Sequence, residues 1–171
     1  MPELDAIAVD LASAEDMPQI ADIYNHSVTH SIANFSTRPT TTTERLEWFR
    51  RYSTTGPHRL LVARRGTTVL GYAASSAYRP ELEAFRETVE VSVSLHHTAR
   101  RQGIGTRLYA ALFDHLDAEP VHVALAGIAL PNEASVALHR KFGFAEIGVF
   151  REYAMKDGQR ISSLWMDRLL P

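Results

Sequence analysis

The segment from Glu90 to Tyr109 changes from the apolar period of a strand to that of a helix, across a turn that contains two glycines. Up to Leu95 every second residue is apolar, which is typical of a strand. From Ile104 the apolar residues recur three and four positions apart, which predicts an amphipathic helix. Gly103 and Gly105 therefore lie at a helix start, where the first backbone N–H groups lack helical acceptors and the helix dipole is positive. Because glycine lets a ligand approach the main chain closely, we expect this turn to bind an anion.

Two common phosphate-binding loops do not fit the turn. A Walker A loop would have glycine in place of Thr98 and lysine in place of Ile104. A dinucleotide-binding turn would have a third glycine in place of Leu108. The remaining pattern, Arg100-x-x-Gly103-x-Gly105, resembles the pyrophosphate-binding signature of the Gcn5-related N-acetyltransferases, the GNAT family. The alternative is an ordinary strand-to-helix turn whose arginines are solvated.

Composition narrows the possible chemistry. The chain has 171 residues, 45% of them hydrophobic, and no cysteine. Disulfides, thiolate nucleophiles and cysteine-ligated zinc are therefore excluded. A net charge of −2 with scattered basic residues gives no electrostatic case for nucleic acid. There is no run of about 18 apolar residues and no apolar signal segment near the N-terminus, so we expect no membrane contact, a cytoplasmic location and one domain over residues 1–171.

Local signals predict helices and strands along the rest of the chain. Ser13-x-x-Asp16 and Thr41-x-x-Glu44 are typical of helix starts. Pro131 is expected at the first position of a helix that ends near Phe142-Gly143. Strands are predicted over residues 7–11, 59–63, 69–76 and 121–128, followed by two strands that turn at Lys156-Asp157-Gly158. This order resembles the GNAT fold. The resemblance implies an α/β (α+β) class: a mixed, mostly antiparallel sheet of about seven strands, splayed between strands 4 and 5 and flanked by about four helices.

Four sequence blocks resemble one branch of that family, the phosphinothricin and methionine sulfoximine acetyltransferases. The blocks are residues 23–26, Asn34-Phe35, Glu90 to Tyr109, and residues 130–139. The resemblance implies acetyl-CoA as acetyl donor, a small-molecule amine as acceptor, and a homodimer. It also assigns cofactor-binding residues on the motif strand, in the turn and at the later helix start: Val93, Ser94, Leu95, Arg100, Arg101, Gln102, Gly103, Ile104, Gly105, Thr106, Asn132 and Ser135.

Three residues are candidates for proton transfer. Glu90 lies on the polar side of the motif strand and matches the catalytic glutamate of the family, so we predict that it accepts the proton of the attacking amine. The alternative is that Glu90 faces solvent or holds an arginine. Tyr109, one helical turn after Gly105, is predicted to protonate the leaving thiolate, unless it packs in the core with its hydroxyl satisfied. His139 shares a helix face with Asn132 and Ser135, which suggests a lined cavity; a buried histidine bonded to a carbonyl explains it equally well.

The acceptor site is predicted from two loops, with substrate-binding candidates Phe35, Arg79, Phe85 and Arg86. Pro80 and Leu82 stand where the branch has basic side chains that hold the anionic end of the amino acid. Arg79 and Arg86 are the nearby replacements. Glu81 and Glu83 in the same loop disfavour a doubly anionic substrate and favour a cationic or less charged amine.

Other interpretations remain open. The same fold serves protein or peptide N-terminal acetyltransferases, which need an open groove, and non-catalytic acyl-CoA sensors, in which Glu90 and Tyr109 would be free to vary. We expect no metal, because the pairs His26/His30 and His96-His97 lack nearby carboxylate ligands and a His-Glu-x-x-His context. The apolar segment formed by Leu164-Trp165-Met166 and Leu169-Leu170 is either a dimer interface or an internal strand.

Overall fold

The computed structural model describes residues 6–171. Over this range the chain forms seven strands, which are β1 (Ile7–Leu11), β2 (Leu60–Arg65), β3 (Thr68–Ala77), β4 (Thr88–Leu95), β5 (Val123–Ala129), β6 (Ala145–Lys156) and β7 (Gln159–Leu169). Its four α-helices are α1 (Met17–His30), α2 (Thr42–Phe49), α3 (Ile104–Leu116) and α4 (Glu133–Lys141). Short 3-10 turns are η1 (Ala14–Asp16), η2 (Glu83–Phe85) and η3 (His97–Ala99).

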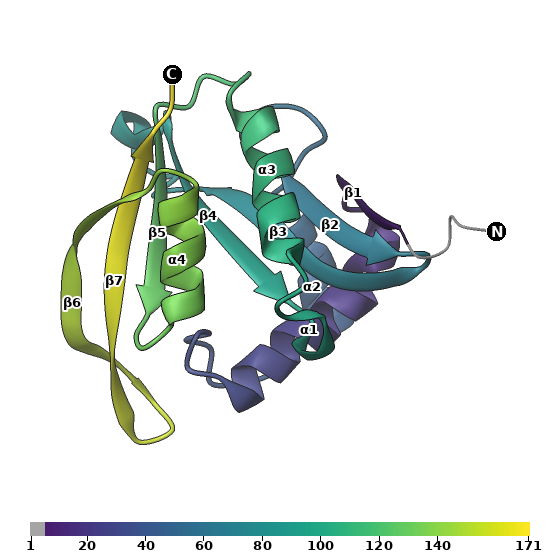
Figure 1. The fold of residues 1–171 in the computed structure, drawn as a ribbon, viewed down its shortest axis with the longest axis horizontal. Helices are drawn as coiled ribbons and strands as arrows, with labels where there is room; N and C mark the ends of the chain where they lie inside the picture. The colour runs from purple at the N-terminus through teal and green to yellow at the C-terminus, as the bar shows by residue number, and fades with distance from the viewer. Residues whose placement is uncertain (1–5) are drawn as a thin grey trace.

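The strands form one sheet in the order β1-β2-β3-β4-β5-β7-β6. Of the strand pairs formed by residues 6–171, only β4 and β5 are parallel, and they pair through three positions, of which Glu90 opposite Leu125 is the last. Both strands continue beyond this pair, to Leu95 and Ala129, without further pairing to each other. Figure 1 shows the two strands diverging from that point. The predicted fold class is therefore confirmed, including the splay between the fourth and fifth strands.

Helices cover both faces of the first half of the sheet. On β2, Leu61 and Ala63 pack in one hydrophobic cluster with α3, whereas Leu60 and Val62 pack in a second cluster with α1. This alternation follows from the two-residue period of a strand. In Figure 1, α3 and α4 lie in front of the sheet. The face that carries α3 and α4 is thus opposite to the face that carries α1.

The start of α4 differs from the predicted one. Asn132 is the N-cap, and its side-chain oxygen accepts a hydrogen bond from the Ser135 N–H at 3.2 Å. The helix therefore begins at Glu133, and the placement of Pro131 at the first helical position is wrong. Asparagine satisfies an otherwise orphaned N–H group, which makes it the stronger start signal here. The predicted end at Phe142-Gly143 is confirmed, with Gly143 at φ +81°.

The start of α2 is the predicted capping box. The Thr41 hydroxyl accepts from the Glu44 N–H at 3.1 Å, and the Glu44 carboxylate accepts from the Thr41 N–H at 2.8 Å. We expect Thr41→Ala to lower the free energy of unfolding by about 1 kcal/mol, because it leaves a helix N–H without an acceptor. Urea denaturation measures this change. Thr43→Ala is the control, since Thr43 lies inside the helix and makes no cap; equal destabilisation by both substitutions would contradict the assignment.

Candidate active site

Beyond Glu90, one edge of β4 has no strand partner. On its other edge β4 pairs with β3 up to Leu95 opposite Gly71. On the β5 side the ladder ends at Glu90, so backbone N–H and C=O groups between Val91 and Leu95 face the opening without a ladder partner in the described part of the chain. Backbone groups of this kind require hydrogen-bond partners, and an unpaired strand edge can bind an extended ligand that carries amides. Val93, Ser94 and Leu95, predicted to bind the cofactor, all lie on this edge and are half-buried.

The turn after β4 ends in a helix N-terminus with free donors. Arg101 and Gly103 have positive φ angles of 61° and 72°, and Gly103 caps α3 without a side chain. The first N–H groups of α3 are therefore available to an anion. Among residues 6–171, neither Arg100 nor Arg101 belongs to an ion pair, so both cations are free to bind one as well.

Gly103 and Gly105 have different surroundings in the turn. A Cβ on Gly103 would have no atom within 4 Å, whereas a Cβ on Gly105 would lie 3.2 Å from Leu138 Cδ2. Gly105 is buried in the structure. The missing Cβ at Gly105 thus lets α3 pack closely against α4, and only Gly103 leaves open space at the turn. Close packing against α4 is thus a reason for glycine at position 105 that is separate from ligand binding.

Gln102 and Ile104 connect the turn to neighbouring parts of the protein, Gln102 through hydrogen bonds and Ile104 through packing in the core. Gln102 donates to the Thr98 carbonyl at 3.1 Å and accepts from Arg65 at 3.4 Å. The Ile104 side chain is buried in the core. Ile104 and Thr106 belong to the first turn of α3, so their backbone N–H groups are the ones that point out of the helix start.

Glu90 lies at the point where β4 and β5 separate. It is half-buried, and its neighbours in the sheet are Ser76 on β3 and Leu125 on β5. Burial raises the pKa of the Glu90 carboxyl above its usual value. No described residue forms an ion pair or a side-chain hydrogen bond with it. A partly buried carboxylate with a raised pKa and no arginine partner is suited to accept a proton near neutral pH.

Tyr109 and His139 form a buried pair between α3 and α4. The exposed fraction of Tyr109 is 0%, and its hydroxyl lies 2.9 Å from His139 Nε2. His139 Nδ1 lies 2.7 Å from the Ser135 carbonyl oxygen. Because a carbonyl only accepts, Nδ1 carries the proton, and Nε2 accepts from the Tyr109 hydroxyl. Burial lowers the pKa of His139 and raises that of Tyr109, so both side chains are neutral at pH 7.

Both residues show the features expected if their role is structural. Tyr109 lies in the core with its hydroxyl hydrogen-bonded, and His139 is hydrogen-bonded to a backbone carbonyl. Tyr109 packs against Phe113 and Phe142 in addition. It extends from α3, on the face of the sheet where Val89 and Val91 are buried, whereas Glu90 alternates to the opposite face. The helix face shared by Asn132, Ser135 and His139 is thus occupied by internal hydrogen bonds.

The substitution Tyr109→Phe distinguishes a structural role of the phenol from a catalytic one. The substitution leaves His139 Nε2 buried without a donor, so we expect the free energy of unfolding to fall by about 1–3 kcal/mol. Because the phenol is fully buried and its proton is donated to His139, we expect kcat to fall by less than about tenfold. Chemical denaturation and steady-state kinetics measure the two effects. A larger loss of kcat in a stable variant would assign the phenol as the acid.

The loop that follows α1 carries Phe35, whose exposed fraction is 39%. Two residues of α1 hold this loop. Tyr24 is hydrogen-bonded to Ser36, and the Asn25 amide both donates to the Thr40 carbonyl and accepts from the Thr40 N–H, at 2.8 and 2.7 Å. The first of the four sequence blocks therefore contains the anchors of the Phe35 loop.

The loop before β4 leaves one arginine without an acidic partner. Arg86 pairs with Glu83 at 3.5 Å and with Glu87 at 3.2 Å. Arg79 instead lies over the ring of Phe85, with its guanidinium carbon 5.6 Å from the ring centroid. In the described residues Arg79 forms no ion pair. Of the two predicted replacements for the missing basic side chains, Arg79 is thus the one free to bind an anion.

Comparison with known proteins identifies the family. The model of the acetyltransferase (GNAT) family matches residues 19–144. The chain belongs to the GNAT acetyltransferase family. A phosphinothricin N-acetyltransferase of Streptomyces coelicolor is 42% identical to this chain, and the alignment covers 99% of this chain and 100% of the relative. An L-methionine sulfoximine/L-methionine sulfone acetyltransferase of Pseudomonas paraeruginosa is 35% identical over 91% of this chain and 87% of its own. The Salmonella typhimurium acetyltransferase yncA, solved with its cofactor acetyl-CoA, superposes with a TM-score of 0.91 at 31% identity, covering 98% of this chain and 95% of that one.

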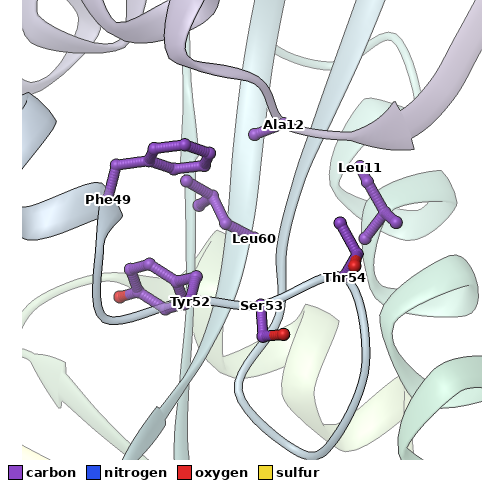
Figure 2. Close-up of a pocket in the computed structure, with 7 residues that line it drawn as sticks. All are labelled: Leu11, Ala12, Phe49, Tyr52, Ser53, Thr54 and Leu60. Atoms are coloured by element: carbon purple, nitrogen blue, oxygen red, sulfur yellow. The ribbon is translucent and has the colours of Figure 1, made fainter.

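Two cavities lie outside the β4–β5 opening of this GNAT protein. Figure 2 shows the smaller one, between the end of α2 and the start of β2, lined by residues such as Phe49, Tyr52 and Leu60. Its volume of about 50 Å³ suits water rather than a cofactor. A groove of about 660 Å³ lies between α4 and β6, and Asn132 is the only predicted site residue that lines it.

Four imidazoles stack beside the turn. His26 lies 4.3 Å from His30 and 4.2 Å from His97, and His97 lies 4.3 Å from His96, between ring centroids. Burial and the neighbouring imidazoles lower the pKa of His26. Within residues 6–171 no three His, Cys, Asp or Glu side chains are grouped as metal ligands would be.

In residues 6–171 no helix has both the length and the apolar character needed to span a membrane.

Sequence reasoning missed the residue that fastens the Phe35 loop to the other half of the sheet. Lys156, near the tip of the β6–β7 hairpin, is buried and donates to the carbonyl oxygens of Ser31 and Asn34. No periodic or motif signal marks it. Its one distinction in the sequence is rarity, since Lys141 is the only other lysine.

Proposed function

We propose that this protein is an N-acetyltransferase that moves the acetyl group of acetyl-CoA to the primary amine of a small amino-acid-like molecule. The observation that carries the proposal is the placement of Glu90 where β4 and β5 separate, at the inner end of an unpaired strand edge that leads to a helix N-terminus. Family membership and the names of the relatives support it. We assign the activity to one domain over residues 1–171.

The cofactor residues fit the chemistry of acetyl-CoA. The unpaired edge at Val93, Ser94 and Leu95 suits the amides of a pantetheine arm. The N–H groups at the start of α3, with Arg100 and Arg101, suit a pyrophosphate. Asn132, which caps α4 by accepting from the Ser135 N–H, and Ser135 itself are proposed to border the same ligand.

The chemistry requires no covalent enzyme intermediate. The amine nitrogen attacks the thioester carbon, the N–C bond forms as the C–S bond breaks, and the sulfur leaves as a thiolate. Glu90 is proposed to accept the proton that the nitrogen loses, directly or through one water. Burial raises the pKa of Glu90, which makes its carboxylate a stronger base than that of an exposed glutamate. Tyr109 and His139 stay the candidates for returning a proton to the thiolate, and because they are buried and bonded to each other, we expect this step to contribute less than about tenfold to kcat.

The acceptor is proposed to be an amino acid with one carboxylate, such as methionine sulfone or methionine sulfoximine, in preference to the doubly anionic phosphinothricin. Arg79 supplies one free cation near the site, whereas Arg86 is paired with carboxylates. Glu81 in the same loop adds negative charge. Two anionic groups on one substrate would thus meet a single free arginine. Phe35 and Phe85 are proposed to form the apolar walls.

The test is release of free thiol from acetyl-CoA by the purified protein, with parallel acceptors. These are phosphinothricin, methionine sulfone, methionine sulfoximine, ordinary amino acids, polyamines and peptides. We expect saturable turnover with higher kcat/KM for the methionine derivatives than for phosphinothricin. Turnover with peptides alone would indicate an N-terminal acetyltransferase. Binding of acetyl-CoA without turnover on any amine would indicate a sensor.

We further propose a cytoplasmic homodimer that associates through β6. β7 lies inside the sheet, and Leu164, Met166 and Leu170 are buried in the core of the same chain, so most of the C-terminal apolar segment is internal. Leu169 is the exposed member of that segment, and the largest group of exposed apolar side chains lies on the edge strand β6: Ile147, Val149, Phe150, Tyr153 and Met155. Light scattering after size-exclusion chromatography tests the dimer, and Ile147→Asp with Val149→Asp is expected to give monomers.

A further inference from the structure

Lys156 is a buried cation outside the predicted catalytic residues. Its exposed fraction is 3%, and its Nζ donates to the Ser31 carbonyl at 2.8 Å and to the Asn34 carbonyl at 2.6 Å. No carboxylate of the described residues forms an ion pair with it. A buried ammonium is costly unless it is hydrogen-bonded, so the two carbonyls must stay in place for Lys156 to remain buried.

These two carbonyls belong to the loop that carries Phe35, and Lys156 belongs to the opposite half of the sheet. The loop starts from α1, which packs on β2 and β3, whereas β6 is the edge strand beyond β5 and β7. Figure 1 places the segment after α1 below the diverging ends of β4 and β5. Lys156 therefore joins the two halves of the sheet at the wide end of the opening.

A bulge in β6 adds a second contact to the same loop. The register between β6 and β7 shifts between Phe150 and Ala154, and Glu152 has a φ of 51°. The Tyr153 ring then meets the edge of Phe35, with centroids 5.9 Å apart, and its hydroxyl donates to Ser163 at 3.0 Å. A bulge of this kind redirects a side chain that regular pairing would send elsewhere.

The anchors of the loop thus come from two directions. Tyr24 and Asn25 hold Ser36 and Thr40 to α1, and none of these hydrogen bonds involves Lys156. Residues 31–35 are tied to β6 by Lys156 and Tyr153. The position of Phe35 relative to the opening therefore depends on β6.

We propose that Lys156 is a positioning residue for the acceptor: its buried ammonium fixes residues 31–35 across the β4–β5 opening and so sets the Phe35 wall. The proposal rests on the proposed function, in which Phe35 borders the acceptor site. In the described residues the hydrogen bonds of Lys156 go to Ser31 and Asn34 and none joins it to the turn before α3 or to the unpaired edge of β4, so we expect cofactor affinity to be independent of it.

Lys156→Met removes both hydrogen bonds and the charge, and Lys141→Met is the matched control because Lys141 is exposed on α4. In Lys156→Met we expect amide hydrogen exchange of residues 31–36 to accelerate by at least about tenfold, with residues 104–116 unchanged. We expect the KM of the amine to rise by at least about tenfold, the Kd of acetyl-CoA to stay within about twofold, and kcat to fall less than KM rises. Lys141→Met is expected to match the unsubstituted protein in all four measurements.

Unchanged exchange in residues 31–36, or an acetyl-CoA Kd that rises together with the amine KM, would overturn the proposal. Exchange and cofactor affinity need no turnover, so they report on Lys156 even if the acceptor proposed above is wrong. If Lys156→Met does not fold, Tyr153→Leu serves in its place, since Tyr153 is half-exposed and removing its ring breaks the contact with Phe35, the bond to Ser163 and the contact with Phe150 on the same strand. Its expected effects have the same directions and are smaller, and their absence would equally overturn the proposal.

Discussion

Glu90→Gln is expected to lower turnover at pH 7 by at least about tenfold, because general base catalysis typically contributes about 100-fold or more, while the Kd of acetyl-CoA stays within about twofold. The amide keeps the size of the carboxylate and cannot accept a proton. The unpaired edge of β4 and the turn before α3 are untouched by the change, which is why cofactor binding is expected to persist. Calorimetric titration with acetyl-CoA and the thiol-release assay measure the two quantities. Glu47→Gln, on the exposed side of α2, is the control.

The pH profile gives a second readout of Glu90. Only the ionised carboxylate is a base, so kcat/KM should fall as pH drops through the pKa of Glu90, which burial raises above its usual value. This acidic limb should therefore lie at higher pH than for an exposed glutamate, and it should disappear in Glu90→Gln. Persistence of the same limb in the variant would assign it to another group, such as the attacking amine.

Glu90→Gln is expected to affect the stability of the fold in the opposite direction to its effect on activity. A carboxyl whose pKa is raised in the folded state destabilises the fold as pH rises through its unfolded pKa, because ionisation is harder in the folded protein. At pH 7 the neutral amide of Glu90→Gln avoids that cost. We therefore expect the variant to unfold at the same or a slightly higher temperature than the unsubstituted protein. A loss of activity without a loss of stability would separate catalysis from misfolding.

The strand, turn and helix that carry the proposed cofactor site were predictable because they are local in sequence. Glu90, the unpaired edge and Gly103 lie within one strand-turn-helix unit, so periodicity and the glycine spacing place all of them. The splay between β4 and β5 was not visible in the residues of either strand, and it came from the resemblance to the family. Gly105 shows the limit of local reasoning, because its packing partner Leu138 lies on another helix.

The acceptor side was less predictable because its contacts join distant segments. The bonds from Lys156 to Ser31 and Asn34 span more than a hundred residues of chain. The pairing of Arg86 with Glu83 and Glu87, which leaves Arg79 free, depends on side-chain directions in a loop. Neither the Lys156 hydrogen bonds nor the Arg86 ion pairs produce a periodic pattern in the sequence. Resemblance selected Phe35 and the residue 23–26 block, and the hydrogen bonds of Tyr24 and Asn25 now give the physical reason for that block.

Gly103→Val is expected to raise the Kd of acetyl-CoA by at least about 100-fold. Gly103 caps α3 at a φ of 72°, and a Cβ there would project into open space rather than into the protein. We propose that the pyrophosphate lies in that space, within reach of the first N–H groups of α3 and the side chains of Arg100 and Arg101. Each charge-assisted hydrogen bond lost contributes about 1.5–3 kcal/mol, and losing two accounts for the expected change.

Backbone strain must be separated from obstruction, because valine is disfavoured at positive φ wherever it occurs. Gly56→Val is the matched control: Gly56 has a φ of 80°, and a Cβ there also has no atom within 4 Å. Gly56 accepts a hydrogen bond from Arg59, which pairs with Glu119 just beyond the C-terminal end of α3, so it lies a helix length from the turn. Both variants should lose similar stability, since both force valine into the left-handed region, but only Gly103→Val should lose acetyl-CoA. Equal affinities in the two variants would contradict the assignment of this turn as the pyrophosphate site, whatever their stabilities.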